Sequence, residues 1–256
     1  MSSQNGVISS VTRFGKYEPF DLQVARGQVN GHSTVSIFGY QSSITTTSIP
    51  VWENATTYAY PASAATMTLA SSSSSDNGAT VLITGLDANF SPISEVVTIA
   101  TGGTSTANSF LRINGMVLTA PASGQVTNVG TITLKISTTI YGQINIGLGK
   151  SQSAIYSVPA NCTFYLDWVE ANTSNSYTSG NYLTYRVVTN NNTNGVQLSV
   201  LQQPFTSIYT ASRVADPFAY PQKTDIQWQL QTSASTYAGG IIVTGKLIQN
   251  ANITSP

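Results

Sequence analysis

Runs of alternating apolar and polar residues dominate this chain, and turn-forming residues separate them. The clearest run is 226–231, in which Ile226, Trp228 and Leu230 alternate with three glutamines. Successive side chains of a strand point to opposite faces of its sheet, so this period predicts a half-buried antiparallel strand. Similar runs lie at 131–137, 164–169 and 183–187. Because no amphipathic stretch is long enough to predict a helix, we expect an all-β fold of β-sandwich or jelly-roll-like domains.

Two segments have the form of antiparallel hairpins. In residues 78–103, two β-branched runs flank a polar reversal that contains Asp87, Asn89 and Pro92. These residue types favour turns, so the two runs are expected to pair. The turn-rich residues 190–195 join two further alternating runs in the same way. Both segments therefore predict strand pairing between neighbours in the sequence.

The chain length and a glycine-rich interruption predict two domains. At 256 residues the chain suits one large β domain or two of ordinary size. Ile146 and Leu148 keep the strand period, while Gly147 and Gly149 loosen the backbone, so we place the boundary between Gly149 and Ser157. The predicted organisation is a flexible or docking arm at 1–20, an N-terminal β-sandwich at 21–150 and a C-terminal jelly-roll-like sandwich at 151–256.

The charge composition excludes some classes of partner. Charged residues make up 8% of the chain, against about 25% in typical soluble domains. Ten basic and ten acidic residues cancel, so no long-range field attracts nucleic acid or an anionic membrane. A neutral, strand-rich surface tends to associate with copies of itself or with neighbours. We therefore expect a homo-oligomer, with a trimer as one form, inside an assembly with other proteins.

Membrane and secretion signals are not found in the sequence. No segment approaches the ~20 consecutive apolar residues of a membrane span. The first ten residues lack the basic and apolar regions of a signal peptide. Cys162 is the only cysteine, which excludes an intrachain disulfide. These features predict synthesis in a cytoplasm.

Residues able to carry chemistry are scarce. His32 is the only histidine, so a His-His metal site is excluded, and a Ser-His-Asp triad would have to be built on a Gly-His-Ser segment. Cys162 has no second cysteine with which to bind zinc, and a buried, inert thiol is expected. We expect no catalytic residue, no cofactor and no metal, and therefore no enzymatic activity.

Acidic residues leave two alternatives open. Asp87 and Glu95 flank the reversal of the first hairpin, and a close pair of carboxylates is what a glycosidase requires. Acidic residues at such positions more often form turns or protect a sheet edge. Oxygen ligands from Asp76, Asn77 or Asp87 are the alternative, as a calcium site without EF-hand spacing.

Aromatic residues supply the candidates for contact with a partner or a glycan. One group follows Pro50 and ends at Pro61, and the other lies in residues 203–220, a segment too apolar for a disordered linker. Large aromatic residues either offer a stacking platform or fill a core or subunit contact. The candidate residues are Trp52, Tyr58, Tyr60, Phe205, Tyr209 and Phe218.

Six segments follow one another through the first two thirds of the chain: FDLQVARGQVNGHSTVSIFGY, VWENATTYAYP, TVLITGLDANFSPISEVVTIATGG, SFLRINGMVLTAP, NVGTI and AIYSVPANCTFYLDWVEA. In this order they resemble virion structural proteins of tailed bacteriophages, particularly marine and cyanobacterial phages. The resemblance covers residues 20–170, and residues from 177 onward match only in their strand pattern. It implies a particle component with β-sandwich domains and without enzymatic activity.

These observations indicate three candidate functions. The first is a capsid decoration or cement protein, located in the virion, that binds the assembled head through the major capsid protein and stabilises it. The alternative is a tail or fibre-type adhesin that binds a host-surface glycan through the aromatic candidates. A polysaccharide-degrading enzyme comes last, because the sequence offers no clear acid–base set.

Overall fold

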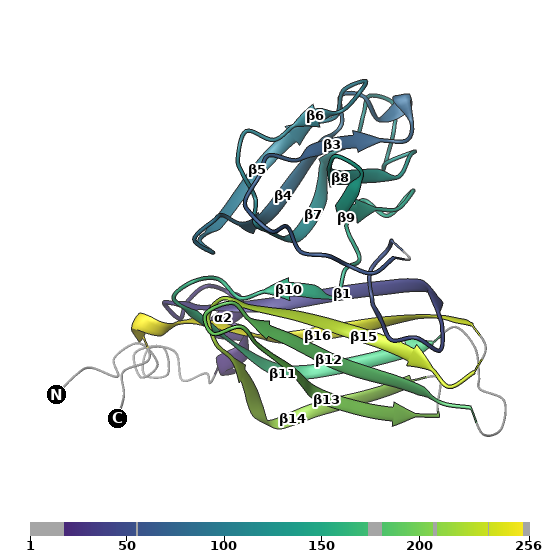
Figure 1. The fold of residues 1–256 in the computed structure, drawn as a ribbon. Coiled ribbons are helices and arrows are strands. Elements are labelled where there is room, and N and C mark those ends of the chain that lie inside the picture. Colours follow the sequence, from purple (N-terminus) through teal and green to yellow (C-terminus); the bar gives the residue numbers. More distant parts are fainter. Residues whose placement is uncertain (1–17, 55, 174–180, 207–208, 235, 253–256) are drawn as a thin grey trace.

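The computed structural model describes residues 18–54, 56–173, 181–206, 209–234 and 236–252 (Figure 1). Antiparallel strands make up most of this part of the chain, which confirms the predicted all-β class. The elements are α2 (Phe20–Ala25), β1 (His32–Ile44), β2 (Ile49–Pro50), β3 (Thr68–Ser71), η1 (Ser74–Asp76), β4 (Thr80–Leu86), β5 (Pro92–Thr98), β6 (Thr104–Ser105), β7 (Arg112–Ala120), β8 (Ile132–Ile136), β9 (Thr139–Ile144), β10 (Ile155–Ser157), β11 (Cys162–Thr173), β12 (Leu183–Asn191), β13 (Val196–Phe205), β14 (Tyr209–Tyr220), β15 (Thr224–Thr232), β16 (Tyr237–Gln249) and η2 (Asn250–Asn252).

The lower lobe of Figure 1 is a jelly roll. One of its sheets has the strand order β1-β16-β11-β14, and the other has the order β10-β15-β12-β13, with β2 added beside β15. Numbered in chain order, β1 and β10 to β16 form sheets 1-8-3-6 and 2-7-4-5. Apart from β12 and β13, which form a hairpin within one sheet, strands that follow one another in the chain thus alternate between the sheets, as in a double Greek key.

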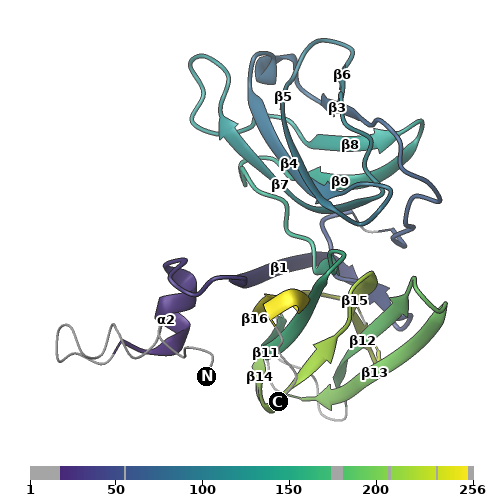
Figure 2. The ribbon, with the colours of Figure 1, turned by 90° about the vertical axis from the view of Figure 1, so that its left-hand side faces the viewer.

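The upper lobe is a smaller sandwich formed by residues 53–150. Its sheets have the orders β6-β3-β8-β9 and β5-β4-β7. The chain leaves the jelly roll after β2 and returns to it at β10, so this sandwich is an insertion into the jelly roll. Figure 2 shows the two lobes stacked, with α2 projecting to one side of β1. We refer to the upper lobe as the insert.

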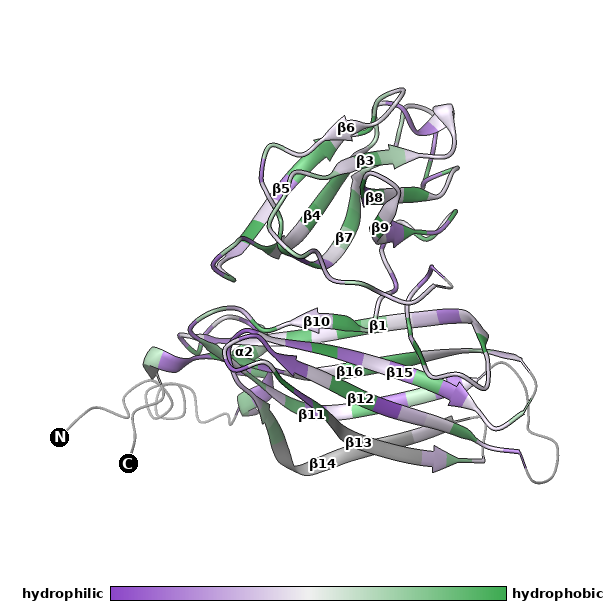
Figure 3. Ribbon diagram, in the orientation of Figure 1, coloured by the Kyte–Doolittle hydropathy of each residue, from purple (hydrophilic) through white to green (hydrophobic). Residues whose placement is uncertain are grey.

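Each lobe has its own hydrophobic core. Apolar and polar residues alternate along strands of both lobes, as along β4 and β15 in Figure 3, and alternate positions of these two strands are buried. The jelly-roll core includes Phe164, Tyr185 and Trp228, all fully buried. The core of the insert includes Phe110 and Met116. Burial of such side chains is the main favourable contribution to the stability of each lobe.

The predicted domain ranges 21–150 and 151–256 are corrected by the strand pairing. β1 pairs with β16 along its length, from His32 opposite Ile248 to Ile44 opposite Tyr237. Residues 32–50 therefore belong to the C-terminal lobe, and the first half of the chain is not a separate unit. The alternation in β1 identifies a strand, but a local pattern does not identify a partner near the other end of the chain.

The predicted hairpins are confirmed. β4 pairs with β5 around the reversal at Asp87, and β12 pairs with β13 around residues 192–195. The strand predicted through Ile146 and Leu148 is wrong, because β9 ends at Ile144 and both side chains are exposed on the turn that follows. Gly147 and Gly149 have φ of 77° and 65° there, a left-handed conformation that breaks the strand.

The segment 203–220 connects the two sheets of the jelly roll. It holds the end of β13 and all of β14, which pairs with β11 in the opposite sheet. The segment therefore crosses from one sheet of the sandwich to the other. The predicted arm at 1–20 lies outside the described residues up to position 17, and α2 begins at Phe20. No helix among the described residues is long and apolar enough to cross a membrane.

Candidate interaction surfaces

The first aromatic group is enclosed where the two lobes meet. Trp52 and Tyr58 pack edge to face with ring centroids 5.0 Å apart, and Tyr58 and Tyr60 do the same at 5.1 Å. Trp52 Nε1 donates a hydrogen bond of 2.7 Å to the Thr56 carbonyl, and Trp52 and Tyr58 are buried. Burial also raises the pKa of the Tyr58 and Tyr60 hydroxyls. The predicted glycan contact is therefore wrong for Trp52 and Tyr58, which are buried, and the partly buried Tyr60 packs against them.

A buried ion pair joins the lobes beside these rings. Arg112 of β7 binds Asp225 of β15 through two parallel bonds, Nε to Oδ1 at 2.8 Å and Nη2 to Oδ2 at 2.9 Å. The Ser157 hydroxyl and the Asn192 amide also donate to this carboxylate, at 2.5 and 2.8 Å. The guanidinium lies 4.7 Å from the centre of the Tyr60 ring. Fully partnered on both sides, the pair fixes one relative position of the lobes.

Glu53 lies at the point where the chain enters the insert. Its side chain is buried, and its Oε1 accepts a hydrogen bond of 3.1 Å from the Asn145 backbone. Burial raises the pKa of Glu53 to about 7, against the opposing effect of the Asn145 and Gln152 backbone N–H groups. This carboxyl group therefore changes charge near neutral pH at the boundary between the lobes.

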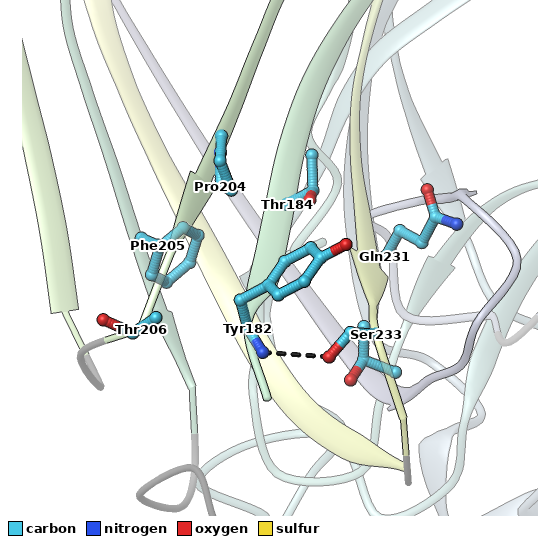
Figure 4. Close-up of a pocket in the computed structure, with 8 residues that line it drawn as sticks. Tyr182, Thr184, Pro204, Phe205, Thr206, Gln231 and Ser233 are labelled. Carbon is cyan, nitrogen blue, oxygen red and sulfur yellow. Dashed lines mark hydrogen bonds between the residues drawn. The ribbon is translucent and has the colours of Figure 1, made fainter. Parts of the chain in front are cut away.

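A groove opens at one end of the jelly roll and is shown in Figure 4. It has a volume of about 550 Å³, and we call it the end groove. Thr184 of β12 forms its floor, with Pro204 of β13 and Gln231 of β15 opposite it in the neighbouring strands. Tyr182, just before β12, is 44% exposed. Phe205, one of the sequence candidates, lines the same groove and is largely buried in the core.

A second, smaller groove of about 210 Å³ lies between the edge strands β13 and β14. We call it the edge groove. Its apolar lining includes Val196, Leu198 and Phe218, and Phe218 is 41% exposed. The backbone of Tyr209 pairs with Asn172, while its side chain lies outside the described residues. The structure thus separates the aromatic candidates into three places rather than one site.

Exposed apolar side chains also gather on two loops of the insert. They are Val126, which is 96% exposed, Val129, Ile146 and Leu148, and we call them the loop patch. The buried Asn128 side chain joins the two loops, because its amide donates to the Asn145 carbonyl and its oxygen accepts from the Gly149 N–H. Hydrogen bonds to Asn128 therefore hold the backbone that carries the exposed side chains of the loop patch.

The acidic candidates stabilise loops. Asp76 is fully buried, and its carboxylate accepts hydrogen bonds from the Val129 and Gly130 backbone at 2.7 and 2.8 Å. Asp87 accepts two backbone bonds within its own turn, and Glu95 accepts two from the loop at 107–108. No cluster of three metal-ligating side chains occurs in the part of the chain that the structure describes. These bonds explain all three carboxylates as loop anchors.

The remaining candidates for chemistry are His32 and Cys162, and both pack against other residues of the fold. The His32 ring lies at the start of β1, edge to face with Phe20 at 6.0 Å. Cys162 begins β11 with a buried side chain, and burial raises the pKa of its thiol. This burial agrees with the inert thiol predicted for it.

Sequence comparison finds no relative of this chain, whereas structural comparison finds distant neighbours. No protein-family model matches the chain, and no curated protein matches it. It is similar to the infectious bursal disease virus VP2 subviral particle, at 15% identity over 88% of this chain and 74% of that chain, with a TM-score of 0.25. Structures of the Gx and Gt strains of that virus match at 14% and 12% identity, covering 86% and 92% of this chain and 72% and 79% of theirs, with TM-scores of 0.26 and 0.23.

Proposed function

We propose that this chain is a structural protein of a virus particle, and specifically a decoration protein of a tailed-phage head. The observation that carries the proposal is the jelly roll with a second sandwich inserted between its strands. Jelly rolls recur in viral capsid and lectin domains. Since a fold alone does not define a function, the sequence resemblance to tailed-phage virion proteins supplies the second support.

The rigid junction between the lobes suits a protein that is present in many copies. The buried Arg112–Asp225 pair and the adjoining aromatic rings hold the insert in one position on the jelly roll. Symmetric lattices repeat one contact many times, and a rigid subunit loses less conformational freedom on joining them. In this proposal one lobe lies on the lattice and the other projects or contacts a neighbour.

Contacts with the particle are assigned to the loop patch. Its side chains are apolar and exposed, and an exposed apolar cluster is typical of an interaction site. With few charges on the chain, such contacts would depend on apolar burial and respond weakly to salt. Self-association as a homo-oligomer, with a trimer as one form, belongs to the same proposal.

A binding assay with phage heads tests the proposal. Heads that lack the protein are mixed with the purified chain and separated on a density gradient, beside isolated tails and unassembled major capsid protein. We expect binding to assembled heads alone, and its loss in Val126→Asp/Ile146→Asp. Val96→Asp is the matched control, because Val96 is also exposed but lies on β5. Binding to tails alone would contradict decoration and favour the adhesin.

The adhesin is retained as the second candidate because of the end groove. This groove combines an exposed tyrosine with hydroxyl and amide side chains at one end of the jelly roll. A tail or fibre protein with such a groove would use it to contact a host-surface glycan. Gradient fractions that contain tails but no heads distinguish this location from the first.

A further inference from the structure

We propose that the end groove is a binding site for a neutral saccharide, with Tyr182 as the stacking residue. The end groove belongs to the chain itself, so the site does not depend on where on a particle the chain is located. The glycan contact is now placed in this groove and not at the enclosed rings of the lobe junction. Of the aromatic candidates whose side chains the structure describes, only Phe205 lines this groove.

The chemistry of the lining selects an uncharged ligand. The described side chains that line the groove are aromatic, proline, hydroxyl or amide groups, and no Asp, Glu, Lys, Arg or His is among these described residues. A pyranose ring has an apolar C–H face and a rim of hydroxyl groups, so it fits an apolar wall beside neutral hydrogen-bonding groups. An anionic ligand would find no cation to balance its charge.

The Tyr182 ring is positioned as a wall of the groove. Figure 4 shows it between Pro204 and Phe205 on one side and Gln231 and Ser233 on the other, with its hydroxyl directed towards Gln231. The backbone N–H of Tyr182 donates a hydrogen bond of 2.9 Å to Ser233 Oγ, which holds the tyrosine in place. The backbone of Tyr182 is held while its side chain is 44% exposed, so the ring provides apolar area to a ligand.

Two polar side chains that line the groove keep hydrogen-bonding capacity. Gln231 Nε2 donates to the Thr46 carbonyl at 2.6 Å, which leaves the Gln231 carbonyl oxygen as an acceptor. Ser233 Oγ accepts from the Tyr182 backbone, so its own O–H can donate elsewhere. A saccharide hydroxyl can both donate to the first and accept from the second.

The size of the groove also fits a saccharide. Its volume of about 550 Å³ lies within the range of about 300–1,000 Å³ that small-molecule sites occupy. The edge groove, at about 210 Å³, is below this range. The two grooves of the jelly roll therefore differ in the size of ligand that they suit.

Saturation-transfer NMR on the purified full chain tests the site. The probes are the methyl glycosides of glucose, galactose and mannose, with N-acetylglucosamine and the anionic N-acetylneuraminic acid for comparison. We expect transfer to at least one neutral probe, and affinity at least about fivefold weaker in Tyr182→Ala, since the aromatic face is lost. Tyr40→Ala is the matched control, because Tyr40 is an exposed tyrosine on β1 of the other sheet.

A second variant keeps the test independent of folding. Gln231→Ala removes the acceptor from a half-buried position and is expected to weaken the same probe. Absence of transfer to every neutral probe, or equal transfer in wild type, Tyr182→Ala and Gln231→Ala, would overturn the site. Stronger transfer to N-acetylneuraminic acid than to the neutral probes would overturn its neutral specificity. Head binding is measured separately with the loop-patch variants, so failure of one proposal leaves the other testable.

Discussion

The two lobes of this molecule are stabilised in different ways. In the jelly roll, long strands pair with partners far away in the chain, as the 13-residue strands β1 and β16 do. In the insert the longest strand, β7, has nine residues, and the hairpins β4–β5 and β8–β9 are local. Buried polar anchors, Asp76 and Asn128, hold its loops. The jelly roll thus depends on distant apolar contacts, and the insert on local pairing supported by polar anchors.

Because the two lobes are stabilised separately, their relative position depends on the junction between them. The insert is attached by two crossings of the chain, and its position is fixed by Arg112, Asp225 and the rings beside them. A surface ion pair contributes little, whereas a buried charge that loses its partner is costly. The junction should therefore be more sensitive to substitution than either set of loops.

The largest effect is expected from Asp225→Ala. This variant leaves the buried Arg112 guanidinium without its carboxylate, which costs about 3–5 kcal/mol of the free energy of unfolding. Urea denaturation measures the loss. Asp21→Ala is the control: its exposed carboxylate pairs with Lys246, and it should cost less than about 1 kcal/mol. Small and equal losses from both variants would show that the pair does not hold the junction.

A smaller and more local effect is expected from Asp76→Ala in the insert. The Val129 and Gly130 backbone N–H groups lose their acceptor, and we expect a loss of about 2–3 kcal/mol. Hydrogen exchange should accelerate in β3 and β8 while β11 and β16 keep their protection. Asp87→Ala, which removes bonds from an exposed turn, should cost about 1 kcal/mol or less. Equal acceleration in both lobes would contradict the separate stabilisation of the insert.

The raised pKa of Glu53 predicts how the free energy of unfolding changes with pH. The pKa of Glu53 is raised from 4.5 to about 7, so the folded chain holds this proton more tightly than the unfolded chain. Its contribution to stability is complete below pH 4.5 and is lost as pH rises through 7. From pH 5 to pH 8 the free energy of unfolding should fall by about 1–2 kcal/mol more in the wild type than in Glu53→Gln. Parallel urea curves across this range would refute the assignment.

The smallest effect on stability is expected in the loop patch. Val126 is 96% exposed, so Val126→Ser should change the free energy of unfolding by no more than about 0.5 kcal/mol. Calorimetry should give an unchanged melting profile, while binding to phage heads weakens. Phe110→Ala in the core of the same lobe is the contrast, at about 3–5 kcal/mol. A large loss from Val126→Ser would mean that the patch serves the fold instead of a partner.

Local alternation in the sequence predicted the strands well and their partners poorly. β15 and the hairpins β4–β5 and β12–β13 follow from period-two runs and turn residues. The pairing of β1 with β16 does not, because side-chain alternation carries no information about which distant strand lies alongside. For the same reason no local signal brought Arg112 and Asp225 together.

The candidate site was predicted only in part. Phe205 was named from its segment and does line the end groove, whereas Trp52 and Tyr58 are buried. Tyr182 was missed, although a signal for it exists. Leu183 and Tyr185 point into the core, so the same alternation places Tyr182 on the outer face of the sheet.

Immunogold electron microscopy of purified particles, with antibody raised against this chain, is the decisive test of the decoration role. If the chain decorates the head, gold is distributed over the heads of the virions. Gold confined to tails would contradict decoration and leave a virion protein of the adhesin type. Absence of gold from particles, with the chain present in the infected cells, would contradict the virion assignment itself.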